Sequence, residues 1–268
     1  MPPDNGTMLG FLKKQKQEQS TACPGVLRAV AASDTGLVRS DNQDSFFSDS
    51  IRGVFCVSDG MGGGAEGAKA SRIVCDTLAE SVRGVIAGPG GMRRAIDGAI
   101  SSANGIIYEY ASKKGFRQMG ATAAVLAFDG MSRGRVAVCH VGDSRIYRIR
   151  RGLPKCLTRD HTVGMELGGM IDRSRMAEFK KRSNPLSHIL TRAVGTTGSV
   201  LADWQETDAE AGDRFLICSD GVHDVVSDAR IAVIAGHGSI AKAMSNLTDE
   251  VVKCGAPDNY TAILIEVC

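Results

Sequence analysis

Residues 54–64 form the stretch Val54-Phe55-Cys56-Val57-Ser58-Asp59-Gly60-Met61-Gly62-Gly63-Gly64. Its four apolar residues predict a buried strand, and the glycine run lets the chain turn sharply before a helix. Asp59 stands where the strand ends, and the adjacent Gly60 has no side chain to shield its carbonyl oxygen from a ligand. A strand that ends in Asp-Gly is also ordinary turn chemistry. The stretch alone therefore allows a metal-binding strand end or a simple turn.

The same pattern recurs at two other places in the chain. Residues 214–221 form an apolar run that closes in Asp220-Gly221, and residues 136–144 form another that reaches Asp143. All three carboxylates can then emerge at one rim of a sheet layer. Clustered acids need a counter-charge, which in a folded protein is a cation. The recurrence therefore favours a metal site.

The composition sets outer limits on the function. A chain of 268 residues is long enough for one large domain, which buries roughly 70–75% of its unfolded surface. Lys plus Arg (32) nearly balances Asp plus Glu (30), and only 5% of the residues are aromatic, so nucleic acid is not an expected partner. The sequence has no apolar run of transmembrane length and no hydrophobic core of a signal peptide. We therefore predict a soluble, cytoplasmic protein without membrane insertion, and we expect a monomer.

Cysteine usage agrees with a reducing compartment. The chain has eight cysteines, with no CxxC pair and no His-Cys ligand spacing. Most lie in apolar runs, so we interpret them as small core residues rather than as a disulfide framework or a zinc site.

Periodicity and turn residues predict the elements of the chain. Residues 1–22 are polar and are expected to form a flexible tail, and residues 23–268 are expected to form the domain. The expected helices are residues 65–85 and 92–114, and the expected strands are residues 26–32, 121–128, 135–141 and 145–149. The last three strands are expected to be consecutive antiparallel neighbours joined by short turns at Asp129-Gly130 and Gly142-Asp143. Such a meander disfavours a doubly wound parallel sheet.

Seven motifs together make the sequence resemble the metal-dependent PPM/PP2C protein serine/threonine phosphatases, in their bacterial type. They occur in the order of the family, across about residues 25 to 267, and the ordered set is specific although each motif alone is weak. The motifs are Gly36-Leu37-Val38-Arg39 with Asn42-Gln43-Asp44, Ser58-Asp59-Gly60-Met61-Gly62-Gly63, Gly120-Ala121-Thr122-Ala123, Val141-Gly142-Asp143-Ser144-Arg145, Thr158-Arg159-Asp160-His161, Ser219-Asp220-Gly221-Val222 and Asp258-Asn259-Tyr260-Thr261.

The resemblance implies an α+β fold, a four-layer α-β-β-α sandwich in which two antiparallel sheets pack face to face with helices outside. It implies a metal site at one edge of the sheets. In that site Asp59 would bridge two divalent ions, Gly60 would offer its carbonyl to one, and Asp220 and Asp258 would complete the other. Two further roles follow in the same way, with Asp44 hydrogen-bonding waters on the ions and Asp143 holding a third, weaker ion. Oxygen donors of this kind favour Mn²⁺ or Mg²⁺ over zinc.

The reaction implied is hydrolysis of phosphoserine and phosphothreonine monoesters. A water that bridges two cations would attack the phosphorus without a protein nucleophile. Arg39 would clamp the phosphate, because its planar guanidinium can donate two parallel hydrogen bonds to phosphate oxygens. The partners implied are phosphorylated proteins and a serine/threonine kinase that the enzyme opposes. Without the surrounding motifs, a solvated loop arginine would be the simpler interpretation of Arg39.

Three features differ from other family members or vary among them. Gln43 stands where many members carry glutamate, which we expect to weaken metal affinity without abolishing activity. Met61, which the bacterial-type members share, cannot donate a proton to the leaving oxygen as the histidine of eukaryotic members is thought to do. Residues 161–184 are expected to form a variable flap with a basic surface, which either recognises phosphopeptides or is a solvated basic helix. For His161 we expect a structural hydrogen bond.

Two other classes of function remain open. One is a catalytically weak or inactive regulatory binding module, which would be expected to have lost metal aspartates, and this sequence retains Asp59, Asp220 and Asp258. The other is a different metal hydrolase, such as a phosphodiesterase or nuclease, and the balanced charge and the complete motif order count against it.

Overall fold

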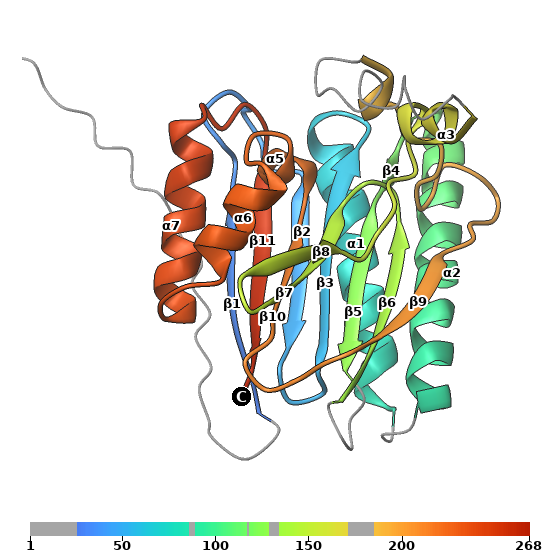
Figure 1. The fold of residues 1–268 in the computed structure, drawn as a ribbon. Helices are drawn as coiled ribbons and strands as arrows, with labels where there is room; N and C mark the ends of the chain where they lie inside the picture. The colour runs from blue at the N-terminus through green and yellow to red at the C-terminus, as the bar shows by residue number, and fades with distance from the viewer. Residues whose placement is uncertain (1–25, 86–88, 117, 129–133, 171–184) are drawn as a thin grey trace, which may run out of the picture.

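Two antiparallel sheets lie face to face between two layers of helices (Figure 1). The structure is a computed structural model that describes residues 26–268 except 86–88, 117, 129–133 and 171–184. The expected tail, residues 1–22, and the basic part of the expected flap lie outside the described residues. The two sheets and the helix layers outside them confirm the predicted fold class, a four-layer α-β-β-α sandwich.

Each sheet combines strands from distant parts of the chain. The five-stranded sheet has the order β1-β11-β10-β7-β8, formed by β1 (Leu27–Asp34), β11 (Tyr260–Val267), β10 (Arg214–Cys218), β7 (Arg145–Arg150) and β8 (Leu153–Cys156). The six-stranded sheet has the order β2-β3-β5-β6-β9, formed by β2 (Asp44–Asp49), β3 (Val54–Met61), β5 (Ala123–Phe128), β6 (Arg135–Val141) and β9 (Asp203–Asp208), with the short β4 (Gly120–Ala121) paired to β3. All the pairings between these strands are antiparallel.

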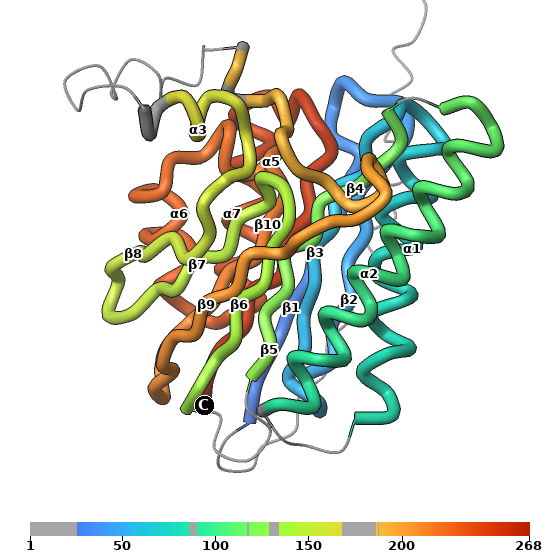
Figure 2. The backbone as a smooth tube through the Cα atoms, turned by 90° about the vertical axis from the view of Figure 1, so that its right-hand side faces the viewer, coloured from blue at the N-terminus to red at the C-terminus, as the bar shows by residue number. Residues whose placement is uncertain are grey.

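The long helices cover the outer faces of the sheets. In the perpendicular view of Figure 2, α1 and α2 lie on one side of the sandwich and α6 on the other. The described helices are α1 (Gly64–Arg83), α2 (Pro89–Lys114), α3 (Val163–Met170), the 3₁₀ turn η1 (Pro185–His188), α5 (Asp220–His223), α6 (Asp228–Ala235) and α7 (Ile240–Lys253). The predicted helices 65–85 and 92–114 are therefore confirmed within a few residues.

Three apolar cores hold the four layers together. One lies between the α1–α2 pair and the six-stranded sheet, a second between the two sheets, and a third between the five-stranded sheet and α5, α6 and α7. Strands between two cores are apolar on both faces, which explains why β5 and β10 are buried at every position. On α1 the buried residues Ala70, Val74 and Leu78 recur every four positions, so one face of the helix packs on the sheet.

The predicted meander is wrong at its second step. β5 and β6 pair as expected, but β7 leaves the sheet of β6 and pairs with β10 in the other sheet. The free side of β6 is taken by β9, where Cys139 lies opposite Trp204. The Gly142-Asp143 turn therefore carries the chain from one sheet to the other. A short turn between two apolar runs has the same local pattern in both arrangements, so periodicity could not distinguish them.

Burial corrects the interpretation of the cysteines in part. Cys56, Cys75, Cys139 and Cys218 are buried as expected, and no cysteine among the described residues forms a disulfide. Three others, Cys156, Cys254 and Cys268, are exposed. Within the described part of the chain, none of the helices combines the length and the apolar character that a membrane span requires.

Candidate functional site

The ends of β3, β6 and β10 and the start of α5 lie at one end of the sandwich (Figure 1), and aspartates stand at or next to these element ends. Asp44 begins β2 and lies opposite Asp59 in the register of β2 with β3. Asp220 begins α5 directly after β10, and Asp143 lies in the turn between β6 and β7. Asp258 precedes β11 by two residues. The structure thus brings the three predicted strand-end acids and both additional aspartates to the same end of the two sheets.

Asp44 is one of the buried polar groups at this end. The Ser219 hydroxyl lies 2.7 Å from its Oδ2 atom. Its Oδ1 atom is buried without a hydrogen-bond partner among the described residues. Burial raises the pKa of Asp44 to about 7, against the opposing effect of the Ser219 hydrogen bond. An ionised Asp44 carboxylate therefore has no ion-pair partner within the part of the chain that the structure describes.

The pKa values of three neighbouring aspartates are raised in the same way. Burial raises the pKa of Asp59, and the negative charges of Asp44 and Asp220 add to the effect. Burial also raises the pKa of Asp143, with a further contribution from Asp220, and it raises the pKa of Asp220. Four acids that are held together in this way are stable as carboxylates only if a cation neutralises them. The donors are all oxygens, so the site fits a hard divalent ion such as Mn²⁺ or Mg²⁺.

Arg39 reaches the same site from the loop between β1 and β2. Its Nη2 atom lies 2.7 Å from Oδ2 of Asp258, and the side chain is about half exposed. The hydrogen bond to Asp258 raises the pKa of Arg39, and the charges of Asp220 and Asp59 contribute as well. Arg39 lies five residues before Asp44, the first residue of β2. A guanidinium held beside the acids in this way is positioned to receive a phosphate.

Gly60 lies where the strand packs directly against a helix. A Cβ atom at Gly60 would lie 1.9 Å from the carbonyl oxygen of Gly67 in α1 and 2.8 Å from that of Gln43. These are backbone atoms, which cannot rotate away. The glycine after Asp59 is therefore required by packing, whether or not its carbonyl binds an ion.

We expect Gly60→Ala to lower the free energy of unfolding by about 2–4 kcal/mol, because the new methyl group overlaps the backbone of α1. Gly63→Ala is the matched control. Its φ is +83° but nothing lies within 4 Å of the added Cβ, so only backbone strain of about 1–2 kcal/mol is expected. Denaturant unfolding of both variants measures the difference, and equal losses would contradict the packing argument.

Asn259 and Ser219 hold the site together, although no role was expected for them from the sequence. The Asn259 side chain accepts a hydrogen bond from the Gln43 backbone N–H at 2.9 Å and donates to the carbonyls of Thr35 and Asp41. Ser219, besides bonding Asp44, accepts from the Thr261 backbone N–H at 3.0 Å. Each residue adjoins a predicted ligand in its motif, and this adjacency is the signal that could have found them.

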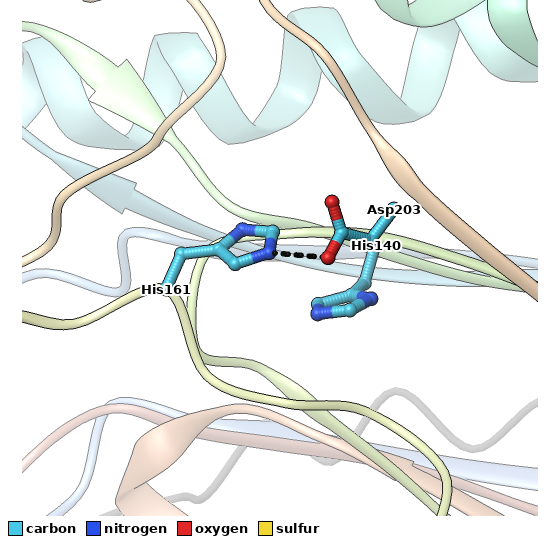
Figure 3. A group of neighbouring side chains, drawn as sticks. All are labelled: His140, His161 and Asp203. Carbon is cyan, nitrogen blue, oxygen red and sulfur yellow. Dashed lines mark ion pairs between the residues drawn. The ribbon is translucent and has the colours of Figure 1, made fainter. Parts of the chain in front are cut away.

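His140, His161 and Asp203 form a second polar group, shown in Figure 3. The rings of His140 and His161 are stacked 4.6 Å apart, and Nε2 of His161 lies 3.3 Å from Oδ2 of Asp203. The Gly142 backbone N–H donates to Nδ1 of His161 at 3.1 Å, so the neutral ring carries its hydrogen on Nε2, facing Asp203. Arg192 already pairs with the other oxygen of Asp203.

The group of His140, His161 and Asp203 has a structural role and is not suited to bind a metal ion. A metal would need the Nε2 lone pair that the tautomer of His161 does not offer, and it would compete with Arg192 for Asp203. The hydrogen bond to Gly142 instead fixes the residue before Asp143. The structural hydrogen bond predicted for His161 is therefore confirmed, whereas its partners His140 and Asp203 had no sequence signal.

Asp224 lies beside Asp220 and was missed by the sequence analysis. His188, Asp220 and Asp224 each place one potential ligand atom within 4.8 Å of the others, and His188 lies 3.2 Å from the Asp224 carboxylate. The spacing of four residues in Asp220–Asp224 puts both acids on one side of a helical turn, which is a signal that could have been used.

We expect the stability of the metal-free protein to fall as the pH rises from 6 to 8. Unfolded aspartates ionise near pH 4, whereas the pKa of folded Asp44 is about 7. Over this range the folded state holds more protons than the unfolded state, so raising the pH favours unfolding. In Asp44→Asn the fall should be smaller by roughly 1–2 kcal/mol.

Urea unfolding in the presence of EDTA at several pH values measures this dependence. Asp97→Asn, at a site on α2 remote from the acids, is the control and should follow the wild type. A fall of equal size in wild type and Asp44→Asn would show that Asp44 is not the group responsible.

A helix-flanked double sheet with aspartates and an arginine at one edge is the architecture that the sequence resemblance implies for metal-dependent phosphatases. The family profile of protein phosphatase 2C matches residues 32–264. The serine/threonine protein phosphatase PstP of Mycobacterium tuberculosis is 33% identical over 244 residues, which cover 90% of this chain and 45% of that protein. This chain therefore spans about half the length of that relative. It belongs to the protein phosphatase 2C family.

Solved structures agree with the family. PppA of Pseudomonas aeruginosa, described as a key regulatory component of T6SS, has a TM-score of 0.81 at 27% identity, covering 91% of this chain and 99% of that one. The catalytic domain of PstP in complex with two manganese ions has a TM-score of 0.77 at 31% identity, covering 90% of this chain and 98% of that one. The whole described fold, and not one motif, is therefore shared.

Proposed function

We propose that this protein hydrolyses phosphoserine and phosphothreonine monoesters of proteins with the help of Mn²⁺ or Mg²⁺. The observation that carries the proposal is the cluster of Asp44, Asp59, Asp143 and Asp220, whose four carboxyl groups outnumber the one guanidinium held beside them, that of Arg39. Family membership and the two manganese ions bound by the related PstP domain support the same conclusion.

Each acid of the cluster has a proposed role. Asp59 and the Gly60 carbonyl would hold one ion. Asp59 would also hold a second ion, together with Asp220 and Asp258. Asp143 would hold a third ion more weakly. When bound, the ions would supply a nucleophilic water at neutral pH and neutralise phosphate charge. Asp44, fixed by Ser219, would accept hydrogen bonds from water at the site. The enclosed position of Asp44 suits this supporting role.

Arg39 would bind and orient the phosphate. Its guanidinium offers several donors in one plane. Among the described residues, Asp258 engages only Nη2, which leaves N–H groups for two phosphate oxygens. Because Asp258 fixes the guanidinium, little side-chain entropy is lost when a substrate binds. Arg39 would thereby place the phosphorus next to the acids.

We also propose the substrates, the cellular location and the oligomeric state of the protein. The substrates would be phosphoproteins made by a serine/threonine kinase that this enzyme opposes. We propose that it acts as a cytoplasmic monomer. The free thiols of the described cysteines agree with the reducing compartment in this proposal.

Comparing a phosphothreonine peptide with a phosphodiester, bis(4-nitrophenyl) phosphate, in the presence of Mn²⁺ tests the reaction class. We expect kcat/KM for the peptide to exceed that for the diester by at least about 100-fold, since the clamp suits a terminal phosphate with three free oxygens. Faster diester hydrolysis would favour a nuclease-like activity. No turnover of either compound by folded protein would favour a regulatory binding module.

A further inference from the structure

Two exposed apolar side chains stand next to the proposed phosphate clamp. Leu37 is 66% exposed and Val38 is 71% exposed, and Arg39 follows them directly in the chain. Single exposed apolar residues are common on protein surfaces and need no functional explanation. A pair beside a binding group can contribute to binding if the loop backbone that carries both residues is held in one position.

The backbone of this loop is held against the segment that precedes β11. The Leu37 backbone N–H donates to the carbonyl of Ala256 at 2.9 Å. Gly36 has a φ of +78°, and a Cβ atom there would lie 2.3 Å from the carbonyl oxygen of Asp258. The loop therefore packs directly against the segment that carries Asp258, with no room for a side chain between them.

Side chains fix the loop at both of its ends as well. Asp34 accepts a hydrogen bond from the Gly36 backbone N–H at 2.9 Å. Asn259 donates to the carbonyls of Thr35 and Asp41, also at 2.9 Å. A loop held in this way presents its exposed side chains without a large entropy cost on binding.

We propose that Leu37 and Val38 form an apolar lip that selects phosphoprotein substrates with an apolar side chain within about three residues of the phosphorylated residue. The inference rests on the proposed phosphatase function and adds a substrate class to it. Successive Cα atoms are 3.8 Å apart, so both lip residues lie within about 8 Å of the Arg39 Cα. Residues two apart in a peptide are separated by a similar distance. A peptide whose phosphate reaches Arg39 can therefore place a flanking side chain on the lip.

The chemistry of the lip determines which flanking residue it favours. Leu37 and Val38 carry no charge and no hydrogen-bonding side chain, and the adjacent charges, Arg39 and Asp258, are paired with each other. Covering the lip with an apolar side chain removes apolar surface from water on both partners, whereas a polar side chain would lose hydration there. We expect the resulting preference to be about tenfold in kcat/KM.

Two phosphothreonine peptides that differ only in the three residues on each side of the phosphothreonine, all leucine in one and all serine in the other, test the inference. The measured quantity is the ratio of their kcat/KM values with Mn²⁺ present. In the full-length wild-type chain this ratio is expected to be about ten, and in the double variant Leu37→Ser/Val38→Ser it should fall to about one. The double variant Leu37→Met/Val38→Ile, which keeps the lip apolar, should retain the preference.

Ile51→Ser is the control for a change of surface polarity. Ile51 is 80% exposed in the turn at the far end of β2 from Asp44, and its loss should leave the ratio at the wild-type value. A wild-type ratio near one, or a ratio that the lip substitutions leave unchanged, would overturn the inference while the phosphatase function stands. A wild-type protein that hydrolyses neither peptide would overturn both.

Discussion

Replacing Asp220 with asparagine is expected to lower kcat for a phosphothreonine peptide by about 1,000-fold, or roughly 4 kcal/mol of transition-state stabilisation. Asparagine keeps the shape of the side chain but removes its charge, so a cation held by the acids loses one of its anionic ligands. The substitution also removes one negative charge from a cluster in which Asp59, Asp143 and Asp220 repel one another. Without metal, Asp220→Asn should therefore be at least as stable as the wild type.

Stability and activity are thus expected to change in opposite directions, which distinguishes loss of a ligand from loss of the fold. Asp208→Asn is the matched control, because Asp208 is exposed and pairs with Arg148 and Arg150 away from the acids. It should keep kcat within about twofold of the wild type. Steady-state kinetics at saturating Mn²⁺ and thermal unfolding in EDTA measure the two effects. An Asp220→Asn enzyme with more than about a tenth of the wild-type kcat would contradict the proposed role.

Replacing Arg39 with alanine is expected to lower kcat/KM by about 100- to 1,000-fold, because a charged donor pair aimed at the phosphate is lost. The substitution also frees Asp258 from its only described ion pair, which leaves an additional negative charge facing an anionic substrate. Arg39→Lys restores the charge but not the planar donor pair. We therefore expect lysine to recover only part of the loss, leaving a deficit of about tenfold.

Arg52→Ala provides the control for Arg39. Arg52 also forms an ion pair with an aspartate, Asp49, at 2.8 Å, but it lies in the turn at the far end of β2 and β3. Its loss should leave kcat/KM for the peptide unchanged within about twofold. Lysine at position 39 performing as well as arginine would show that a point charge suffices and that the bidentate clamp is not needed.

The strand ends of the site could be predicted from the sequence because their pattern is local. Each of Asp59, Asp143 and Asp220 follows an apolar run and adjoins a turn-forming residue, and strand ends of neighbouring strands meet at an edge of the sheet. Recurrence at three places then indicated a cluster. The structure places all three residues at one end of the sandwich, where their charges interact.

What could not be predicted depends on contacts between distant parts of the chain. The Gly142-Asp143 turn connects the two sheets because β9 and β10, which begin at Asp203 and Arg214, take the positions beside β6 and β7. The bond from Ser219 to Asp44 and the stacking of His140 on His161 likewise join separate elements. No local periodicity reports such pairings, so these residues had no assigned partner at the level of the sequence.

Metal dependence is best measured as hydrolysis of a phosphothreonine peptide by the full chain with Mn²⁺, with Mg²⁺, with EDTA, and with EDTA followed by excess Mn²⁺. We expect turnover with either ion, a loss of at least about 100-fold in EDTA, and recovery when Mn²⁺ is restored. Turnover that survives EDTA would contradict a reaction that depends on the aspartate cluster and its cations. The absence of turnover with any ion, in protein that remains folded, would contradict the phosphatase assignment itself.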